Sequence, residues 1–341
     1  MAGPPPAVAA LRTAVRPGLT ASPQPVLVAC SGGADSLGLA AALAFEGRDA
    51  RVRVGGVVVD HGLQHGSADR ARQTAVLLGD LGLDPVAVVA VAVGADGGPE
   101  GAARSARYEA LSAAAEEHDA RIALGHTLDD QAETVLLGLG RGSGPRSVAG
   151  MVEHRAPYWR PLLGIRRETT RRACAEQGLL VWDDPWNDDP AYTRVRLRTE
   201  VLPLLEEVLG GGVAPALART AAHLREDLDA LDDLAAGQLA RLAADGAADD
   251  GVPARELAGL PAALRRRVLR GWLRGGGVPD LQAVHLAAVD ALLTRWRGQG
   301  RVDLPGGAGV VRTSGRLALL PPEDRGGHPV PTVDLEEPPR D

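Results

Sequence analysis

The first residues that could do chemistry form the segment 30–36, which reads CSGGADS. It follows a short apolar run at 25–29 and precedes an Ala- and Leu-rich stretch, so we expect a strand, a tight turn and a helix. Adjacent glycines let the backbone turn and expose consecutive N–H groups, and the helix N-terminus adds the positive end of its dipole. The hydroxyls of Ser31 and Ser36 can add donors, and Asp35 can bind Mg²⁺ or orient a nucleotide. The segment therefore predicts a phosphate-binding loop.

The second group is GHTLDDQAET at 125–134, which also lies between an apolar run and a predicted helix. Asp130 and Glu133 are three residues apart, so they share one helix face. Acidic residues in a first turn are also favoured by the helix dipole alone, which leaves a purely structural role open. With His126 beside them at the carboxyl edge of the predicted sheet, these carboxylates form a candidate site for a cation or an amine.

Two smaller groups accompany these motifs. Arg104, Arg107 and Tyr108 fall on one face of a predicted helix, a pattern that is also typical of a solvated basic surface. Asp60 and His61 end the second predicted strand, where the base or ribose of a nucleotide would lie in a parallel sheet.

Predicted strands and helices alternate along the first half of the chain and would position these candidate site residues. Apolar, β-branched runs predict strands at 25–29, 52–59, 85–93 and 121–124, and helical patterns fall at 36–45, 68–81, 101–118 and 129–139. Continuous apolar strands separated by helices are typical of βαβ units. We therefore predict an α/β fold with a Rossmann-like parallel sheet, helices on both faces and ligands at the carboxyl ends of the strands.

The pattern changes beyond about residue 205. Helices are predicted at 213–245, 260–273 and 281–297, and short strands at 301–304, 309–312 and 317–320. We expect a catalytic domain at 1–210 and a smaller, mostly helical domain with a few short strands at 211–320. The Pro-rich, acidic tail at 321–341 is predicted to be disordered.

Composition excludes several classes of chemistry. All 37 Lys and Arg residues are arginines, so no Schiff-base lysine and no Walker-type P-loop lysine can exist here. The net charge of −7 argues weakly against nucleic-acid binding, but two arginine-rich stretches, 141–198 and 255–301, could bind a polyanion locally. Two cysteines exclude a disulfide scaffold and a four-cysteine metal site within one chain. Without a membrane-length apolar run or a signal-peptide core, we expect a soluble, cytoplasmic protein with no membrane partner.

Further motifs follow in order: GLGRGSG at 138–144, RPLL at 160–163, WDDPWND at 182–188, YTRVRLR at 192–198 and VLP at 201–203. Together with CSGGADS and GHTLDDQAET, they resemble the tRNA(Ile)-lysidine synthetase family of the N-type ATP pyrophosphatases, whose loop reads SGGxDS. The resemblance covers about 25–205 strongly and 285–320 more weakly. The overall length resembles the short form of the family.

The resemblance implies a ligase that forms a carbon–nitrogen bond. It would use ATP to attach free L-lysine to C2 of the wobble cytidine in an isoleucine tRNA with a CAU anticodon, which changes codon specificity from AUG to AUA. The base would first be adenylated with release of pyrophosphate, and the lysine ε-amine would then displace AMP. The resemblance also implies Mg²⁺ and, from relatives, a homodimer.

Site roles follow from the same resemblance. The ATP-binding residues would be Ser31, Gly32, Gly33, Ala34, Asp35, Ser36, Asp60 and His61, with Asp35 also holding Mg²⁺. The catalytic residues would be Asp35, Asp130 and Glu133, and lysine would be bound by Arg107, Asp130 and Glu133. The tRNA phosphates would be bound by Arg141, Arg146, Arg194, Arg196 and Arg198. These roles are chemically sensible, because an ammonium favours paired carboxylates and must lose a proton before it attacks.

Two positions depart from the family pattern, and three other functions remain open. Gln64 ends an HGLQ segment where the family has HGLR, and Val195 replaces an asparagine. A thiolating tRNA modifier of the same fold would need a cysteine pair, and an amidoligase would need a glutaminase region. A module that senses ATP without chemistry would have no role for the acidic pair.

Overall fold

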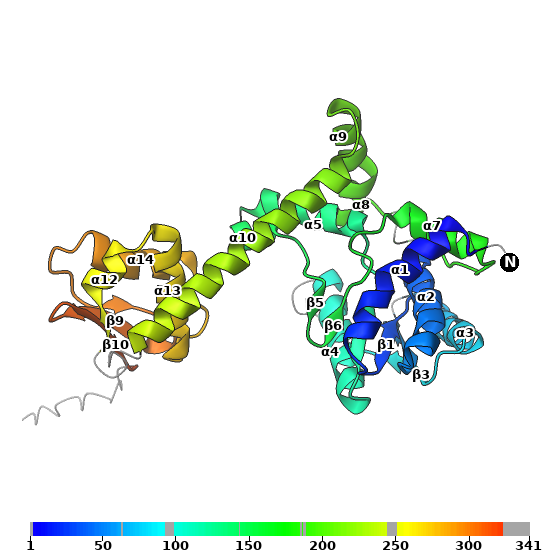
Figure 1. Ribbon diagram of the computed structural model, residues 1–341, viewed down its shortest axis with the longest axis horizontal. Helices are drawn as coiled ribbons and strands as arrows, with labels where there is room; N and C mark the ends of the chain where they lie inside the picture. The colour runs from blue at the N-terminus through cyan, green and yellow to red at the C-terminus, as the bar shows by residue number, and fades with distance from the viewer. Residues whose placement is uncertain are drawn as a thin grey trace, which may run out of the picture. The chain divides into compact units, whose positions relative to one another are not determined.

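The protein was analysed as a computed structural model, which describes residues 3–62, 64–92, 99–142, 144–184, 186, 189–243 and 251–322. Its contacts divide the chain into two units, Met1–Arg225 and Glu226–Asp341. The division falls within the long helix α10 (Val213–Leu242), whereas the predicted boundary at 210 lies at the turn before that helix (Figure 1). From residue 323 onward, the predicted disordered tail lies outside the described residues.

Unit 1 is built on a six-stranded sheet in the order β3-β2-β1-β4-β6-β5. The strands are β1 (Val26–Ala29), β2 (Val54–Asp60), β3 (Val86–Ala90), β4 (Arg121–Leu124), β5 (His154–Arg155) and β6 (Tyr158–Trp159). All neighbours pair in parallel except β5, which is antiparallel to β6. The predicted parallel sheet is therefore confirmed, and the two-residue strands β5 and β6 were missed because they are too short to show a hydrophobic period.

The strand order brings the two predicted motifs together. From the central strand β1 the sheet continues to β2 on one side and to β4 on the other. Such a reversal opens a crevice at the carboxyl ends of the two central strands. Segment 30–36 follows β1 and GHTLDDQAET follows β4. A Cβ on Gly125 would lie 3.0 Å from the backbone carbonyl of Asp35, so glycine permits this close approach.

Alternate residues of β1 face opposite layers of helices, as expected for a sheet that is covered on both faces. Val26 and Val28 belong to a core shared with α1 (Pro6–Ala21), α2 (Ala34–Ala50), α3 (Ser67–Asp80) and α7 (Arg167–Glu176). Leu27 and Ala29 pack with α4 (Pro99–Glu117) on the other face. Helix α1 lies beside α2 (Figure 1) and was not predicted. Pro17 inside the segment argues against a helix in the sequence. The buried apolar residues nevertheless have helical spacing: Val8, Leu11, Val15 and Leu19.

The acidic motif begins helix α5 (Leu128–Arg141), which is followed by the short helix α6 (Pro145–Val148). Further along the chain, α8 (Thr193–Arg196) continues through a π-helical turn at Leu197–Val201 into α9 (Leu202–Val208). Ala132 on α5 packs against Leu202 and against the start of α10. This packing brings the arginines of 194–198 beside the acidic face of α5.

Unit 2 contains α12 (Ala254–Gly259), α13 (Ala262–Gly275) and α14 (Ala283–Thr294). Its antiparallel sheet has the order β7-β10-β9-β8, formed by Val252–Pro253, Arg316–Leu320, Gly309–Thr313 and Val302–Asp303. The predicted smaller, mostly helical domain with a few short strands is confirmed. Within the described parts of the chain, no single helix has the length and hydrophobicity that a membrane crossing needs, and one pair bent by 94° passes only when its two helices are taken together.

Candidate functional site

The loop after β1 has the geometry of a phosphate cradle. Gly32 adopts a φ of +85°, in the left-handed region that favours glycine. The hydroxyl of Ser36 donates to the carbonyl of Gly33 at 3.0 Å and accepts from the N–H of Ser31 at 3.2 Å. This buried hydroxyl therefore holds the turn together, and α2 begins at Ala34 with Asp35 in its first turn.

An open cavity of about 780 Å³, counting the space at its mouth, adjoins this loop. It is lined by the ends of β1 and β2, by the start of α3 and by Trp182, Asp184 and Trp186. Cys30, Ser31, Asp60, His61 and Arg107 are among the lining residues. The carboxyl ends of parallel strands are where folds of this class bind nucleotides. The predicted base or ribose position at 60–61 thus lines a real cavity.

Arg107 gives this cavity an uncompensated positive charge. Burial lowers the pKa of its guanidinium, and none of the described carboxylates lies within ion-pair distance of it. A half-buried cation with no carboxylate partner among the described residues favours an anionic ligand. The nearby imidazole of His61 has a buried Nδ1 that meets no hydrogen-bond partner in the described parts of the chain, and burial lowers its pKa as well.

Two hydrogen bonds through Gln64, which were not predicted from the sequence, lie at one wall of the cavity. Gln64 donates from Nε2 to Asp184 Oδ1 at 2.9 Å and accepts from Arg70 Nη2 at 2.8 Å. The Arg70 guanidinium also lies 4.6 Å from the centre of the Trp182 ring. Where the family pattern has an arginine at 64, this chain has a glutamine that connects Asp184 to an arginine on α3.

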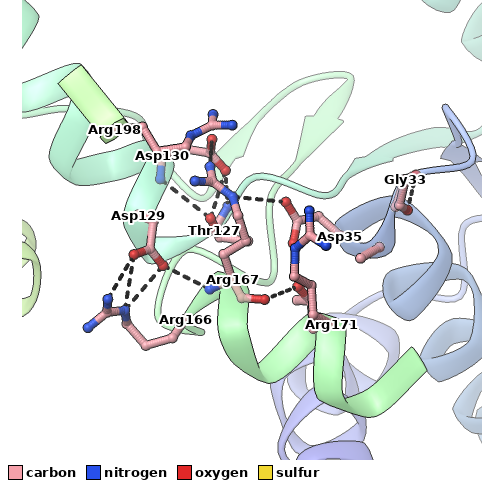
Figure 2. Close-up of polar contacts among 12 residues, drawn as sticks. Gly33, Asp35, Thr127, Asp129, Asp130, Arg166, Arg167, Arg171 and Arg198 are labelled. Carbon is pink, nitrogen blue, oxygen red and sulfur yellow. Dashed lines mark hydrogen bonds and ion pairs between the residues drawn. The ribbon is translucent and has the colours of Figure 1, made fainter. Parts of the chain in front are cut away.

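The carboxylate of Asp130 is oriented by the cap of α5. Its Oδ2 accepts from the N–H of Thr127 at 2.7 Å and from the hydroxyl of Thr127 at 2.8 Å, and Thr127 caps the helix in return (Figure 2). A capping box of this kind fixes the first turn of a helix. The cap uses Oδ2, which leaves Oδ1 for another partner.

That partner is Arg167, which was missed from the sequence. Its Nη2 lies 2.6 Å from Asp130 Oδ1 and its Nε lies 3.4 Å from Asp35 Oδ2 (Figure 2). Its Nη1 lies 3.3 Å from Glu133 Oε1. One guanidinium therefore joins the phosphate loop helix to the acidic helix. Burial lowers the pKa of Arg167, but the surrounding carboxylates outweigh burial and raise it.

Glu133 is fully buried and meets two more arginines. Arg198 Nε lies 3.0 Å from Glu133 Oε1, and Arg194 Nη1 lies 3.8 Å from Glu133 Oε2. The Oε2 atom has no hydrogen-bond partner among the described residues. The structure thus places these two predicted tRNA-binding arginines at the acidic site.

The other predicted tRNA-binding arginines have different surroundings. Arg141 and Arg146 are exposed at the end of α5 and on α6. Arg196 is exposed and pairs with Glu200 at 2.9 Å. These three remain predictions for phosphate contacts.

The pKa values at the site are shifted in different directions. Burial raises the pKa of Asp35, although the hydroxyl of Thr170 and the charge of Arg167 act against it. Burial also disfavours charged Asp130, but Arg167 and the capping N–H outweigh burial and lower its pKa. Burial lowers the pKa of His126 to about 4, so its imidazole is neutral at pH 7.

The described residues do not form a magnesium site by themselves. They contain no group of three or more His, Cys, Asp or Glu side chains that could hold a metal ion. Both oxygens of Asp35 already accept hydrogen bonds, one from Thr170 Oγ1 and one from Arg167 Nε. The role of Asp35 as a Mg²⁺ ligand therefore stays a prediction.

A sequence signal for Arg167 did exist. Arg166 is the N-cap of α7 and Arg167 is its first residue, where the helix dipole disfavours positive charge. Two arginines at such a position indicate carboxylate partners elsewhere in the fold. Arg166 pairs with Asp129 at 2.9 Å, and the N–H of Arg167 donates to Asp129 Oδ2 at 2.8 Å.

Comparisons with known proteins agree with this architecture. Residues 8–205 match the family model described as a PP-loop domain, and residues 253–318 match the TilS substrate binding domain. A tRNA(Ile)-lysidine synthase from Streptomyces coelicolor is 55% identical over 93% of this chain and 99% of its own length. Another from Thermobifida fusca is 53% identical over 94% of this chain and 99% of its own length.

The chain belongs to the tRNA(Ile)-lysidine synthase family.

A solved structure, the U34-tRNA thiolase NcsA from Methanococcus maripaludis with its [4Fe-4S] cluster, matches with a TM-score of 0.52 and 18% identity. The match covers 64% of this chain and 80% of that one, and at this identity it shows the fold alone. Both cysteines of this tRNA(Ile)-lysidine synthase family member are buried, and burial raises the pKa of both thiols. Neither therefore has the exposed thiolate that sulfur transfer requires.

Proposed function

We propose that this protein ligates L-lysine to the wobble cytidine of an isoleucine tRNA with a CAU anticodon, with ATP as the second substrate. The observation that carries the proposal is the close apposition of two chemically different sites. The phosphate loop adjoins both the cavity and a carboxylate cluster, and Asp35 belongs to the loop and to the cluster. Relatives named tRNA(Ile)-lysidine synthase, 53–55% identical over most of the chain, support the same activity.

The proposed reaction has two steps. The C2 oxygen of cytidine attacks the α-phosphorus of ATP, a P–O bond forms, and the bond to pyrophosphate breaks. The lysine ε-amine, after losing a proton, then attacks C2 and forms the C–N bond. The C2–O bond breaks and the oxygen leaves with AMP.

In this proposal the ATP phosphates bind at 31–36, and the nucleoside occupies the cavity beside Asp60 and His61. Arg107 binds an anion, either a phosphate or the lysine carboxylate. Asp130 and Glu133 bind the ε-ammonium and favour its approach to the adenylated base. Arg141, Arg146 and Arg196 bind tRNA phosphates.

The proposal also includes Mg²⁺, a homodimer and a cytoplasmic location. Mg²⁺ would enter with the ATP phosphates, because it usually binds through few protein ligands and keeps substrate oxygens and waters. The family resemblance supports a homodimer and action in the cytoplasm.

The test combines the protein with ATP, Mg²⁺, radiolabelled lysine and a transcript of the isoleucine tRNA with a CAU anticodon. A methionine tRNA with the same anticodon is the control. We expect label in the isoleucine tRNA alone, with one AMP released per lysine transferred. RNA-dependent pyrophosphate release without lysine transfer would overturn the assignment of lysine, and ATP binding without pyrophosphate release would indicate a sensor.

A further inference from the structure

The carboxylates that would bind lysine are already neutralised by the protein. Asp35, Asp129, Asp130 and Glu133 carry four negative charges, and each pairs with an arginine. The arginines are Arg166, Arg167, Arg194 and Arg198, which carry four positive charges. The cluster as it stands therefore offers no net charge to attract a substrate cation.

Arg167 occupies the centre of this cluster. Its guanidinium contacts Asp130, Glu133 and Asp35, and its side chain is 16% exposed. The other three arginines lie at the edge, with side chains 32–47% exposed. Arg167 pairs with both Asp130 and Glu133, so an ammonium that binds to these two carboxylates would compete with its guanidinium.

One acceptor at the site has no donor. Glu133 Oε2 is buried and makes no hydrogen bond to any described residue, and the Arg194 guanidinium lies 3.8 Å away. A buried carboxylate oxygen without a donor is unfavourable and points to a ligand that supplies one. A primary ammonium has three N–H donors. If one N–H of the ammonium donates to Glu133 Oε2, the other two N–H groups need acceptors. The neighbouring acceptors are Asp130 Oδ1 and Glu133 Oε1, which Arg167 now contacts.

The backbone around Arg167 allows its side chain to leave. The N–H of Arg167 donates to Asp129 Oδ2 at 2.8 Å, which holds α7 to α5, and the hydroxyl of Thr170 donates to Asp35 Oδ1, which holds α7 to α2. Helix α7 is therefore anchored without the guanidinium, so an exchange requires only side-chain torsions to change. At the first residue of α7, the helix dipole also opposes the positive charge of Arg167.

We propose that Arg167 is the resident cation of the lysine site, and that the ε-ammonium of lysine binds by exchanging with its guanidinium for Asp130 and Glu133. This proposal rests on the proposed function and adds a specificity-determining residue to it. Arg167 keeps the carboxylates paired when lysine is absent. It also raises the lysine concentration that the site requires, because every bound lysine must displace it.

The experiment measures lysine affinity by calorimetry in wild type, Arg167→Gln and the matched control Arg166→Gln. Arg166 has the same chemistry and the adjacent position, but its partner Asp129 lies outside the three-carboxylate centre. Exchange predicts that Arg167→Gln binds lysine at least about tenfold more tightly, the equivalent of one charge-assisted hydrogen bond no longer lost on binding. Arg166→Gln should stay within about threefold of wild type.

A second readout separates exchange from a purely structural role. Without lysine, Arg167→Gln should melt at a lower temperature than wild type, and saturating lysine should raise its melting temperature more than it raises that of wild type. In Arg167→Ala, millimolar guanidinium chloride, far below denaturing concentration, should compete with lysine. It should not compete in wild type, where the site already holds a guanidinium.

If Arg167→Gln does not fold, Arg167→Lys provides the test, because an ammonium keeps the charge but cannot span three carboxylates. Tighter lysine binding than wild type supports exchange, and equal or weaker binding overturns it. Failure of the proposed function looks different. If the proposed function is wrong, the wild type neither binds lysine nor transfers it to tRNA. If only the exchange is wrong, the wild type still transfers lysine, and the Arg167 variants bind lysine no more tightly than the wild type does.

Discussion

Replacing Gly32 with alanine tests the phosphate loop at one backbone angle. Gly32 has a φ of +85°, and a Cβ there would lie 2.9 Å from the Oγ1 of the buried Thr74. A left-handed conformation costs an L-residue about 1–2 kcal/mol, and the crowding adds to this. For a unit of this size each kcal/mol lowers the melting temperature by about 2–4 °C. We therefore expect Gly32→Ala to melt about 2–8 °C below wild type.

The neighbouring glycine provides a matched control. Gly33 has an ordinary φ of −76°, and a Cβ there would lie 3.7 Å from Ser31 Oγ and 3.9 Å from the Trp182 carbonyl. Gly33→Ala should therefore melt within about 1 °C of wild type. Adding Thr74→Ala to Gly32→Ala should recover the part of the loss that comes from crowding and leave the part that comes from φ.

The same variants separate fold from function. In Gly32→Ala the loop relaxes away from its turn and misdirects its N–H groups, so ATP affinity measured by calorimetry should fall at least about tenfold, or 1.4 kcal/mol. If Gly32→Ala and Gly33→Ala melt at the same temperature as wild type and bind ATP equally well, the left-handed turn is not what shapes the phosphate site. Weaker ATP binding by Gly33→Ala without any loss of stability would show that phosphate approaches that position closely.

Three further perturbations address other parts of the site. Asp130→Asn keeps an acceptor for the N–H of Thr127 but removes the negative charge, so adenylated tRNA should accumulate while lysine transfer falls at least about tenfold. Single-turnover assays with labelled ATP and labelled lysine follow the two steps, and unimpaired lysine transfer would contradict the role assigned to Asp130. Arg196→Glu should raise the KM for tRNA at least about threefold and leave ATP affinity unchanged, and an unaltered KM would remove Arg196 from the tRNA surface. Because the pKa of His126 is lowered from 6.5 to about 4 in the folded chain, the unfolded chain takes up a proton more readily below pH 6.5. Stability is therefore lost as the pH falls through this range, and the melting temperature should drop less between pH 7 and pH 5 in His126→Asn than in wild type; equal drops would refute the shift.

The sheet and the phosphate loop could be predicted because their signals are local. A β-branched run, a pair of glycines and a helical pattern lie within about twenty residues, and the strand–turn–helix they predict is the one observed. The acidic helix was predicted for the same reason. Its capping box, formed by Thr127 and Asp130, is also visible in four consecutive residues.

The partners of the carboxylates could not be derived in this way. Arg167 is 132 residues from Asp35 and 37 residues from Asp130. The packing of α7 against α2 brings it to Asp35, and the bond from its N–H to Asp129 brings it to the first turn of α5. Arg198, expected on a tRNA-binding surface, pairs with Glu133 for a similar reason, since α8 and the turn after it pack on α5. Pairings of this kind depend on tertiary contacts that no short window of sequence contains.

The link between α2 and α7 has a consequence for protein synthesis. A ribosome completes the phosphate loop and the acidic helix well before residues 167 and 170 emerge, so the growing chain carries Asp35, Asp130 and Glu133 without their central cation. Mutual repulsion among these carboxylates then opposes docking of α2 against the start of α5. Translation of α7 supplies Arg167 and removes that repulsion, so the proposed nucleotide site and the proposed lysine site are completed together.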